Sequence, residues 1–216
     1  GIERGDKDRV CVNIPPRHGK SQLVSIFYPA WFLGRNPGKK VMMVSHTTDL
    51  AVDFGRKVRN LIATDTYSSI FPTVKLAQDS KSAGRWNTNV GGEYYACGIG
   101  SALAGRGADL LLIDDPHSEQ DVINGNFEVF EKAYEWFTFG ARTRLMPGGR
   151  VAIIQTRWHL DDLTGRVTRD MSKNERSDQY EVVEFPAILD VKDPKTKKMV
   201  QKPLWPEFFD LEALLR

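Results

Sequence analysis

The tripeptide Gly19-Lys20-Ser21 follows a short apolar run, Val10-Cys11-Val12, and opens an amphipathic stretch from Gln22 to Leu33. This order predicts a strand, a loop and a helix. The N–H groups of such a loop and of the first helical turn converge on one point and favour an anion there. Lys20 would add a mobile positive charge for the β and γ phosphates of a triphosphate, and the Ser21 hydroxyl could coordinate Mg²⁺.

The match to the complete phosphate-loop pattern is partial, because Ile14 stands where the pattern has a glycine. Pro15 and Pro16 stiffen a loop that glycines usually make pliable, and Arg17 adds a second cation. Gly-Lys-Ser is also common in surface turns, so this stretch alone leaves an ordinary turn as the alternative.

A later apolar run, Leu110-Leu111-Leu112-Ile113, ends in Asp114-Asp115. Four unbroken apolar residues are typical of a strand buried on both faces, in the middle of a sheet. Acidic residues at the carboxyl end of such a strand lie at the same sheet edge as the phosphate loop. We expect Asp114 to hold Mg²⁺, directly or through water, and Asp115 to activate the attacking water. The alternative is that Asp114-Asp115-Pro116 merely ends a strand.

Composition is that of a globular chain: 216 residues, 41% hydrophobic and 27% charged, enough for a substantial core. A net charge of +2 does not by itself indicate nucleic-acid binding. Cys11 and Cys97 lie in apolar runs, which predicts buried thiols and a reducing, cytoplasmic setting. The sequence has no apolar run of membrane length, no signal peptide and no metal-ligand cluster among its four histidines.

Strand and helix patterns alternate along the chain, which predicts an α/β fold with a parallel sheet. Helices are predicted at residues 22–33, 48–63, 126–141 and 160–169, and strands at 10–12, 41–44, 110–113, 151–156 and 180–185. Gly91-Gly92 predicts a β-hairpin between residues 85–90 and 93–98. Residues 64–85 are predicted as a loop-rich excursion, and residues 190–202 as a charged hairpin or linker.

Four blocks together resemble the ATPase domain of the large terminase subunit of tailed bacteriophages, the genome-packaging motor. They are the stretches 15–21, 105–116, 155–163 and 203–206, beginning with Pro15-Pro16-Arg17-His18-Gly19-Lys20-Ser21 and ending with Pro203-Leu204-Trp205-Pro206. The resemblance implies a P-loop NTPase fold of the helicase and translocase kind, with a central, mostly parallel sheet flanked by helices. It also implies Mg-ATP hydrolysis coupled to translocation of double-stranded DNA into a procapsid.

Several roles carry over from the family. The nucleotide-binding positions are Pro16, Arg17, His18, Gly19, Lys20, Ser21 and Thr156; the metal positions are Ser21 and Asp114; and the catalytic positions are Asp115, Arg106 and Arg17. Arg17 matches a phosphate-sensing arginine and Thr156 a motif that couples hydrolysis to domain motion. Asp115 stands where many members have a catalytic glutamate, so the water would sit closer or Glu119 would assist. Arg106 matches an arginine that reaches into a neighbouring subunit's site, although a solvated loop residue is the alternative.

The resemblance implies further partners: a portal protein, a small terminase subunit, and other copies of the chain in a homo-oligomeric ring, a pentamer, in the host cytoplasm. We expect residues 1–189 to form the ATPase core and residues 190–216 an extension towards a nuclease domain that this sequence does not contain, so no nuclease activity is expected. The family's adenine-binding segment lies upstream of this sequence. The alternatives are a helicase-like translocase, a nucleotide-binding module without turnover, and a structural capsid protein.

Overall fold

The computed structural model describes residues 1–4, 6–80 and 82–215, so Arg216, the last residue of the predicted extension, lies outside the described residues. Seven strands form one sheet in the order β3-β4-β2-β5-β6-β1-β7, and β3 alone runs antiparallel to its neighbour. Their bounds are β1 Arg9–Asn13, β2 Lys40–Ser45, β3 Arg85–Asn87, β4 Glu93–Gly98, β5 Ala108–Asp114, β6 Leu145–Gln155 and β7 Glu181–Glu184.

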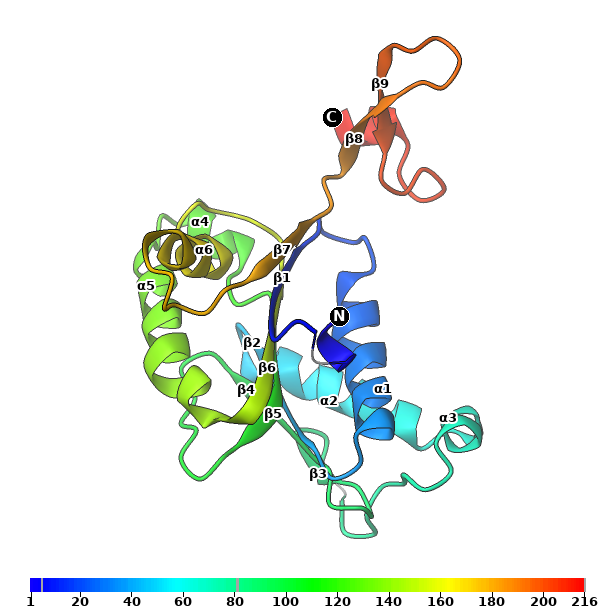
Figure 1. Cartoon of the computed structure of the whole chain (residues 1–216), viewed down its shortest axis with the longest axis vertical. Helices are drawn as coiled ribbons and strands as arrows, with labels where there is room; N and C mark the ends of the chain where they lie inside the picture. The colour runs from blue at the N-terminus through cyan, green and yellow to red at the C-terminus, as the bar shows by residue number, and fades with distance from the viewer. Residues whose placement is uncertain (5, 81, 216) are drawn as a thin grey trace.

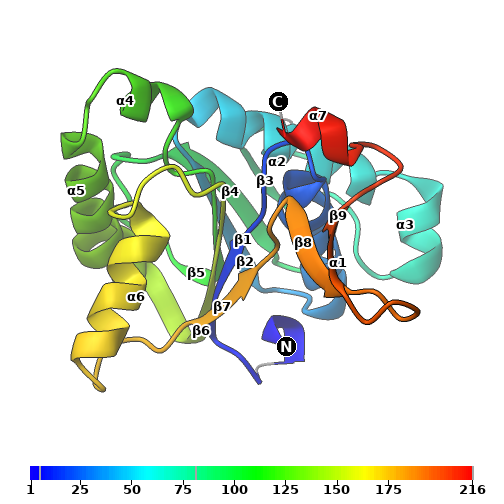
Figure 2. The same cartoon turned by 90° about the horizontal axis from the view of Figure 1, so that it is seen from above.

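Helices cover both faces of this sheet (Figures 1 and 2). One face carries α1 (Tyr28–Arg35) and α2 (Thr48–Ile62), with α3 (Asp65–Ile70) beside them; the other carries α4 (Glu119–Ile123), α5 (Glu128–Glu135) and α6 (Leu163–Lys173). The 3-10 helices η1 (Ile2–Arg4) and η4 (Arg142–Arg144) and the π-helical segments η2 (Gln22–Phe27) and η3 (Trp136–Ala141) complete this body. The predicted α/β class, a mostly parallel sheet flanked by helices, is therefore confirmed.

The alternation of side chains along β5 produces two hydrophobic cores. Leu110 and Leu112 pack on the α1 and α2 side, whereas Leu111 and Ile113 pack on the α6 side, and all four are fully buried. This is the predicted mid-sheet strand, with β2 on one side and β6 on the other. Cys11 and Cys97 are buried and unpaired, as predicted.

The helix that follows the loop with Gly19 contains a π-helical segment near its start because of a proline. Pro29 lacks an N–H group, and its ring would clash with the carbonyl of Ser25 in regular α geometry. The wider turn of η2 ends two residues before Pro29, after which α1 continues to Arg35. The predicted helix is present, but this irregularity was not predicted.

Two expectations were wrong in detail. Residues 64–85 are not all loop, because α3 begins after Thr64, whose hydroxyl accepts a hydrogen bond from the Tyr67 N–H at 3.2 Å. Six residues make fewer than two turns, too few to show a helical period. The short helix predicted at 160–169 runs from Leu163 to Lys173, because Asp162 caps its start.

Beyond β7 the chain forms an arm that extends past the carboxyl edge of the sheet (Figure 1). The antiparallel pair β8 (Ile188–Lys192) and β9 (Met199–Pro203) and the short helix α7 (Leu211–Leu215) make up this arm. Of the two structures predicted for residues 190–202, the hairpin is the one that forms. The predicted domain boundary after residue 189 falls inside β8, and the division into two parts stays a prediction.

Candidate functional site

The loop between β1 and η2 lies at the carboxyl edge of the sheet, where β5 and β6 also end. Arg17 and Gly19 both have left-handed backbones, with φ of 60° and 77°. A Cβ on Gly19 would meet no atom within 4 Å, so the backbone angle and not crowding is the reason for glycine at this position. The loop passes into a helical turn at Lys20, and the Leu23 N–H donates to the Gly19 carbonyl at 3.1 Å.

Lys20 and Asp115 form an ion pair, with Nζ 2.5 Å from Oδ2. Lys20 is 8% exposed, so its charge is largely removed from water and depends on this partner. The other carboxylate oxygen of Asp115 accepts the N–H of Thr156 at 2.9 Å, and the Thr156 hydroxyl donates to the Ile14 carbonyl at 3.3 Å. Three predicted site residues from three separate segments therefore meet at one point.

Asp114 is 1% exposed and has only part of its carboxylate satisfied. The Ser25 hydroxyl donates to Oδ2 at 2.7 Å, whereas Oδ1 is buried and has no hydrogen-bond partner among the described residues. Burial and the neighbouring Asp115 raise the pKa of Asp114 to about 6, against the opposing effects of the Ser21 and Ser25 hydroxyls and Lys20. A carboxylate oxygen beside a hydroxyl is a donor set that suits Mg²⁺, which in proteins takes one or two carboxylates and completes its shell with water and phosphate.

Further buried polar atoms that have no hydrogen-bond partner in the described part of the chain surround these acids. They include the Ser45 hydroxyl, Nδ1 of His46 and the side-chain amide of Gln155. Ser45 ends β2 and is the register partner of Asp114. Buried polar groups are normally hydrogen-bonded, so unpartnered ones gathered at a strand edge indicate a site built for a polar ligand. None of the three was predicted as a site residue, although Ser45 and Gln155 end the apolar strands β2 and β6 and His46 directly follows Ser45.

The outer part of the loop is exposed and contacts the arm. Pro16 and Arg17 are exposed, and Arg17 forms no ion pair with any described residue. Nδ1 of His18 donates to the Pro16 carbonyl at 2.8 Å, and its ring stacks on Phe209 with 5.0 Å between centroids. Glu119, the predicted helper of Asp115, is exposed at the start of α4.

Arg106 is not brought together with the other predicted site residues. It lies in the loop before β5, near the amino edge of the sheet, 3.6 Å from the Glu93 carboxylate and 4.5 Å above the Tyr95 ring. Asp114 and Asp115 stand at the opposite end of that strand. Arg106 therefore does not contribute to the site of its own chain in this arrangement.

A layer of polar contacts holds the segments that follow β5 and β6 together. Arg157 pairs with Asp162 at 2.6 Å, and Asp162 in turn accepts the Gly165 N–H at 2.9 Å, capping α6. Nε2 of His117 accepts the Leu163 N–H at 3.1 Å. Burial lowers the pKa of His117 to about 4, which keeps the ring neutral and able to accept.

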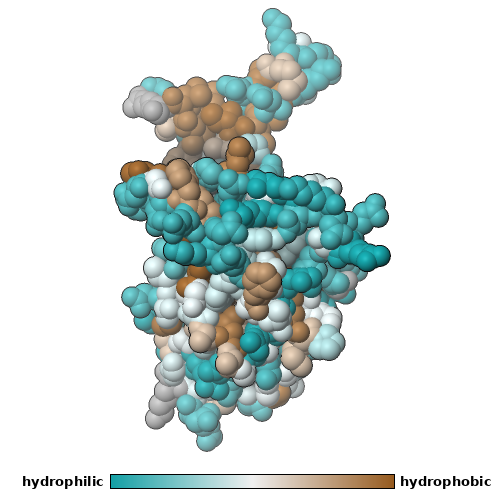
Figure 3. Space-filling model, turned by 90° about the vertical axis from the view of Figure 1, so that its left-hand side faces the viewer, coloured by the Kyte–Doolittle hydropathy of each residue, from teal (hydrophilic) through white to brown (hydrophobic). Residues whose placement is uncertain are grey.

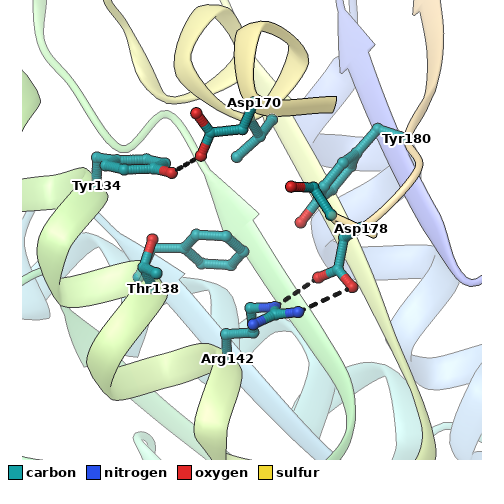
Figure 4. A pocket seen from close by; sticks show the side chains of 9 residues that line it. Tyr134, Thr138, Arg142, Asp170, Asp178 and Tyr180 are labelled. Carbon is teal, nitrogen blue, oxygen red and sulfur yellow. Dashed lines mark hydrogen bonds and ion pairs between the residues drawn. The ribbon is translucent and has the colours of Figure 1, made fainter. Parts of the chain in front are cut away.

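Two cavities differ in their relation to the loop. One, of about 490 Å³, borders the predicted phosphate loop and is lined by the segments that follow β1, β6 and β7. The other, of about 140 Å³, lies between α5, η3 and α6, and Figure 4 shows its carboxylates already engaged. There Arg142 donates to Asp178 at 2.6 and 3.2 Å, and Tyr134 donates to Asp170. The first cavity belongs to the candidate site.

Among the described residues, no helix is both long and apolar enough to span a membrane. Nor do three or more His, Cys, Asp or Glu side chains of that part of the chain gather as a metal cluster.

Comparisons with known proteins agree with the resemblance. The sequence matches the family described as "Terminase large subunit, T4likevirus-type, N-terminal" over residues 11–211. The fold is similar to the large terminase ATPase domain of Thermus phage P74-26, with a TM-score of 0.53 and 15% identity, covering 87% of this chain and 80% of that one. The fold is also similar to an arginine-to-alanine mutant of that phage domain, with a TM-score of 0.54 and 18% identity, covering 95% of this chain and 81% of the mutant chain. No curated protein is similar enough in sequence to match. Because the family match spans nearly the whole chain, this chain belongs to the family of N-terminal domains of T4-like-virus-type large terminase subunits.

Proposed function

We propose that this domain hydrolyses Mg-ATP and couples hydrolysis to the translocation of double-stranded DNA into a procapsid. The observation that supports this most directly is the contact of Lys20 with Asp115, 2.5 Å apart at the carboxyl edge of the sheet. It joins a phosphate-binding lysine to the acid that would act on water, and Asp114 lies directly before that acid.

In this proposal the phosphate loop from Pro16 to Ser21 receives the triphosphate. Loop N–H groups, including those of His18 and Gly19, would face the phosphates, and Lys20 and Arg17 would neutralise them. Lys20 would exchange the Asp115 carboxylate for phosphate oxygens, which releases Asp115 to take a proton from the attacking water. The Thr156 N–H then holds the freed carboxylate in orientation.

Asp114 and Ser21 are the residues that would hold Mg²⁺. The metal, when bound, supplies charge neutralisation on the phosphate oxygens. The unpartnered Oδ1 of Asp114 gives it a ligand, and the Ser25 hydroxyl fixes the other oxygen in place. Because a nearby cation favours the ionised form, metal binding would lower the raised pKa of Asp114.

Arg106 is proposed to act on the site of a neighbouring copy, since it lies away from its own. An arginine that stabilises transition-state charge in trans raises hydrolysis by roughly 10³ to 10⁵. This role requires a homo-oligomeric ring, which we propose to be a pentamer that assembles with a portal protein and a small terminase subunit in the host cytoplasm. We also propose residues 1–189 as the ATPase core and residues 190–216 as its extension.

The test is steady-state phosphate release with Mg-ATP at increasing protein concentration, for wild type, Lys20→Ala, Asp115→Asn and Arg106→Ala. Each single variant is expected to lose at least about tenfold in rate, since removal of one group that stabilises a transition state commonly costs this or more. A mixture of Asp115→Asn and Arg106→Ala should recover part of the rate, because subunits with an intact acid meet subunits with an intact arginine.

The controls separate the competing outcomes. Arg85→Ala changes an exposed arginine that also lies near Glu93, and it should leave the rate unchanged. An unchanged rate in Lys20→Ala would refute the phosphate-loop assignment. ATP binding without phosphate release at any protein concentration would indicate a nucleotide-binding module that does not turn over.

A further inference from the structure

The β8-β9 hairpin is a strongly basic segment of the molecule. Residues 188–203 contain two aspartates and five lysines, which are Lys192, Lys195, Lys197, Lys198 and Lys202. Their net charge is +3, whereas the whole chain has +2, so the remainder of the chain is slightly negative. All five lysines are exposed, and none forms an ion pair with a described residue.

The turn at the tip of the hairpin is stabilised by hydrogen bonds to the Asp193 side chain. Oδ1 of Asp193 accepts the N–H groups of Lys195 and Thr196 at 2.9 and 2.6 Å, and the Thr196 hydroxyl at 3.1 Å. These bonds to the charged form lower the pKa of Asp193 and hold its carboxylate within the turn. The acidic residue of the tip is therefore engaged with the backbone, and the lysines beside it point their charge to solvent.

Lys197 occupies a position that its residue type does not favour. Its φ is 61°, in the left-handed region where glycine and asparagine are preferred. Turn geometry therefore gives no reason for a lysine here, and a residue found in a backbone conformation that it does not favour motivates a functional hypothesis for its side chain.

The arm presents this tip away from the main sheet. The turn between β8 and β9 lies at the far end of the arm in Figure 1, and a hydrophilic end stands above a hydrophobic patch in Figure 3. A two-stranded ribbon is narrow enough to enter the major groove of B-DNA. Lysine side chains bind phosphates whatever the base sequence is. Such contacts can form at any position along a DNA duplex.

We propose that the β8-β9 hairpin is a DNA-binding element, with Lys195, Lys197 and Lys198 contacting the phosphate backbone of double-stranded DNA. This inference rests on the proposed function, which supplies double-stranded DNA as the partner. It adds the surface of the domain that contacts this DNA. The contact is electrostatic and sequence-independent, and it forms outside the nucleotide site.

The test is the binding of a fluorescently labelled DNA duplex, followed by anisotropy between about 50 and 200 mM salt. The variant Lys195→Gln/Lys197→Gln/Lys198→Gln is compared with Lys75→Gln/Lys132→Gln/Lys173→Gln, which removes the same charge from other exposed positions. The hairpin variant should lose about 10- to 100-fold in affinity, and its slope of log K against log salt should fall by up to about 0.9 per lysine. The control should stay within about twofold of wild type.

Lys197→Gly separates binding from folding. Glycine relieves the left-handed backbone, so the midpoint of thermal unfolding should stay equal or rise while DNA affinity falls severalfold. Equal loss of affinity in hairpin and control variants, or no loss in either, would overturn the inference. So would an effect of the hairpin lysines on binding to phosphatidylserine vesicles but not to DNA.

Phosphate release by the same preparations distinguishes this inference from the proposed function. A wild type that hydrolyses ATP but whose DNA affinity does not depend on the hairpin lysines overturns the DNA contact alone. A wild type that binds DNA through the hairpin but releases no phosphate supports the contact and counts against the proposed ATPase.

Discussion

Asp114 carries a charge into the least solvated part of the site. With its pKa raised to about 6 from the usual 3.8, the folded chain binds this proton more tightly than the unfolded chain does. The linked stability is therefore fully present below about pH 4 and is lost as the pH rises through about 6. At neutral pH the ionised, half-satisfied carboxylate is a local destabilisation that a bound cation would relieve.

Asp114→Asn should accordingly stabilise the free protein at neutral pH. A difference of about two pKa units corresponds to at most roughly 3 kcal/mol in the free energy of unfolding above pH 6, and to almost nothing near pH 4. Urea unfolding across this range measures it, with Asp79→Asn, an exposed aspartate, as the control. A gain of the same size at both ends of the range would show that the charge of Asp114 is not its cause.

The start of α6 depends on side chains from two different segments. Asp162 accepts the N–H of Gly165, and His117, which follows β5, accepts the N–H of Leu163. The first N–H groups of a helix have no partner within the helix, so both contacts replace water. Through the His117 contact, α6 is attached to the segment that carries Asp114 and Asp115. The segments that follow β5 and β6 are therefore held in a fixed position relative to each other.

This capping predicts a loss of stability in acid. The pKa of His117 is lowered to about 4 from 6.5 by burial, so the unfolded chain binds the additional proton between these values and stability falls as the pH is lowered through them. The loss is roughly 3 kcal/mol. Asp114 acts in the opposite direction over much of this range, so the effect is best measured with Asp114→Asn as the parent.

In that parent, His117→Gln should abolish most of the acid-induced loss, because glutamine keeps an acceptor for the Leu163 N–H but does not titrate here. Unfolding in urea between about pH 4 and 7 provides the measurement, and His18→Gln, on the outer loop, is the matched control. If the loss persists in His117→Gln, another group is responsible for it.

The strands that sequence patterns predict well are those buried on both faces, such as β2 and β5, because their apolar runs are unbroken. Short helices such as α3 and α4 escaped prediction, since five or six residues show no period. For the site, the glycine-lysine-serine turn and the paired acids are local signals. Ser45 and Gln155 are candidates only because the sheet places them beside the end of β5. Strand order sets that placement, and the local sequence does not show it.

The arm returns to the body at the loop after β1, where Phe209 stacks on His18. Trp205, Phe208 and Phe209 form one aromatic cluster on the arm, and Phe208 remains 59% exposed. The two aromatic rings therefore link the arm to the loop proposed to bind phosphates. A movement of the arm would therefore displace the loop, and a movement of the loop would displace the arm.

Phe209→Ala should loosen this connection. An aromatic pair contributes about 0.5–1.5 kcal/mol, so amide exchange in β8 and β9 is expected to rise about 2- to 10-fold while β2 and β5 stay unchanged. Hydrogen exchange followed by mass spectrometry measures it, and Leu215→Ala, an exposed apolar residue of α7, is the control. Unchanged exchange in Phe209→Ala would mean that other contacts hold the arm.

The place of β1 between β6 and β7 has a consequence for how the molecule is made. Arg9 pairs in register with Val151 of β6, and Val10 pairs with Glu181 of β7. The strands that pair with β1 therefore lie more than a hundred residues later in the chain. At about 5–20 residues per second, a ribosome needs roughly 7 to 30 s to produce them. During that time β1 presents an unpaired edge, and such distant pairings slow folding. The loop that follows β1, which we propose to bind phosphates, therefore acquires its final shape late in synthesis, and the proposed nucleotide binding would begin only once the fold is complete.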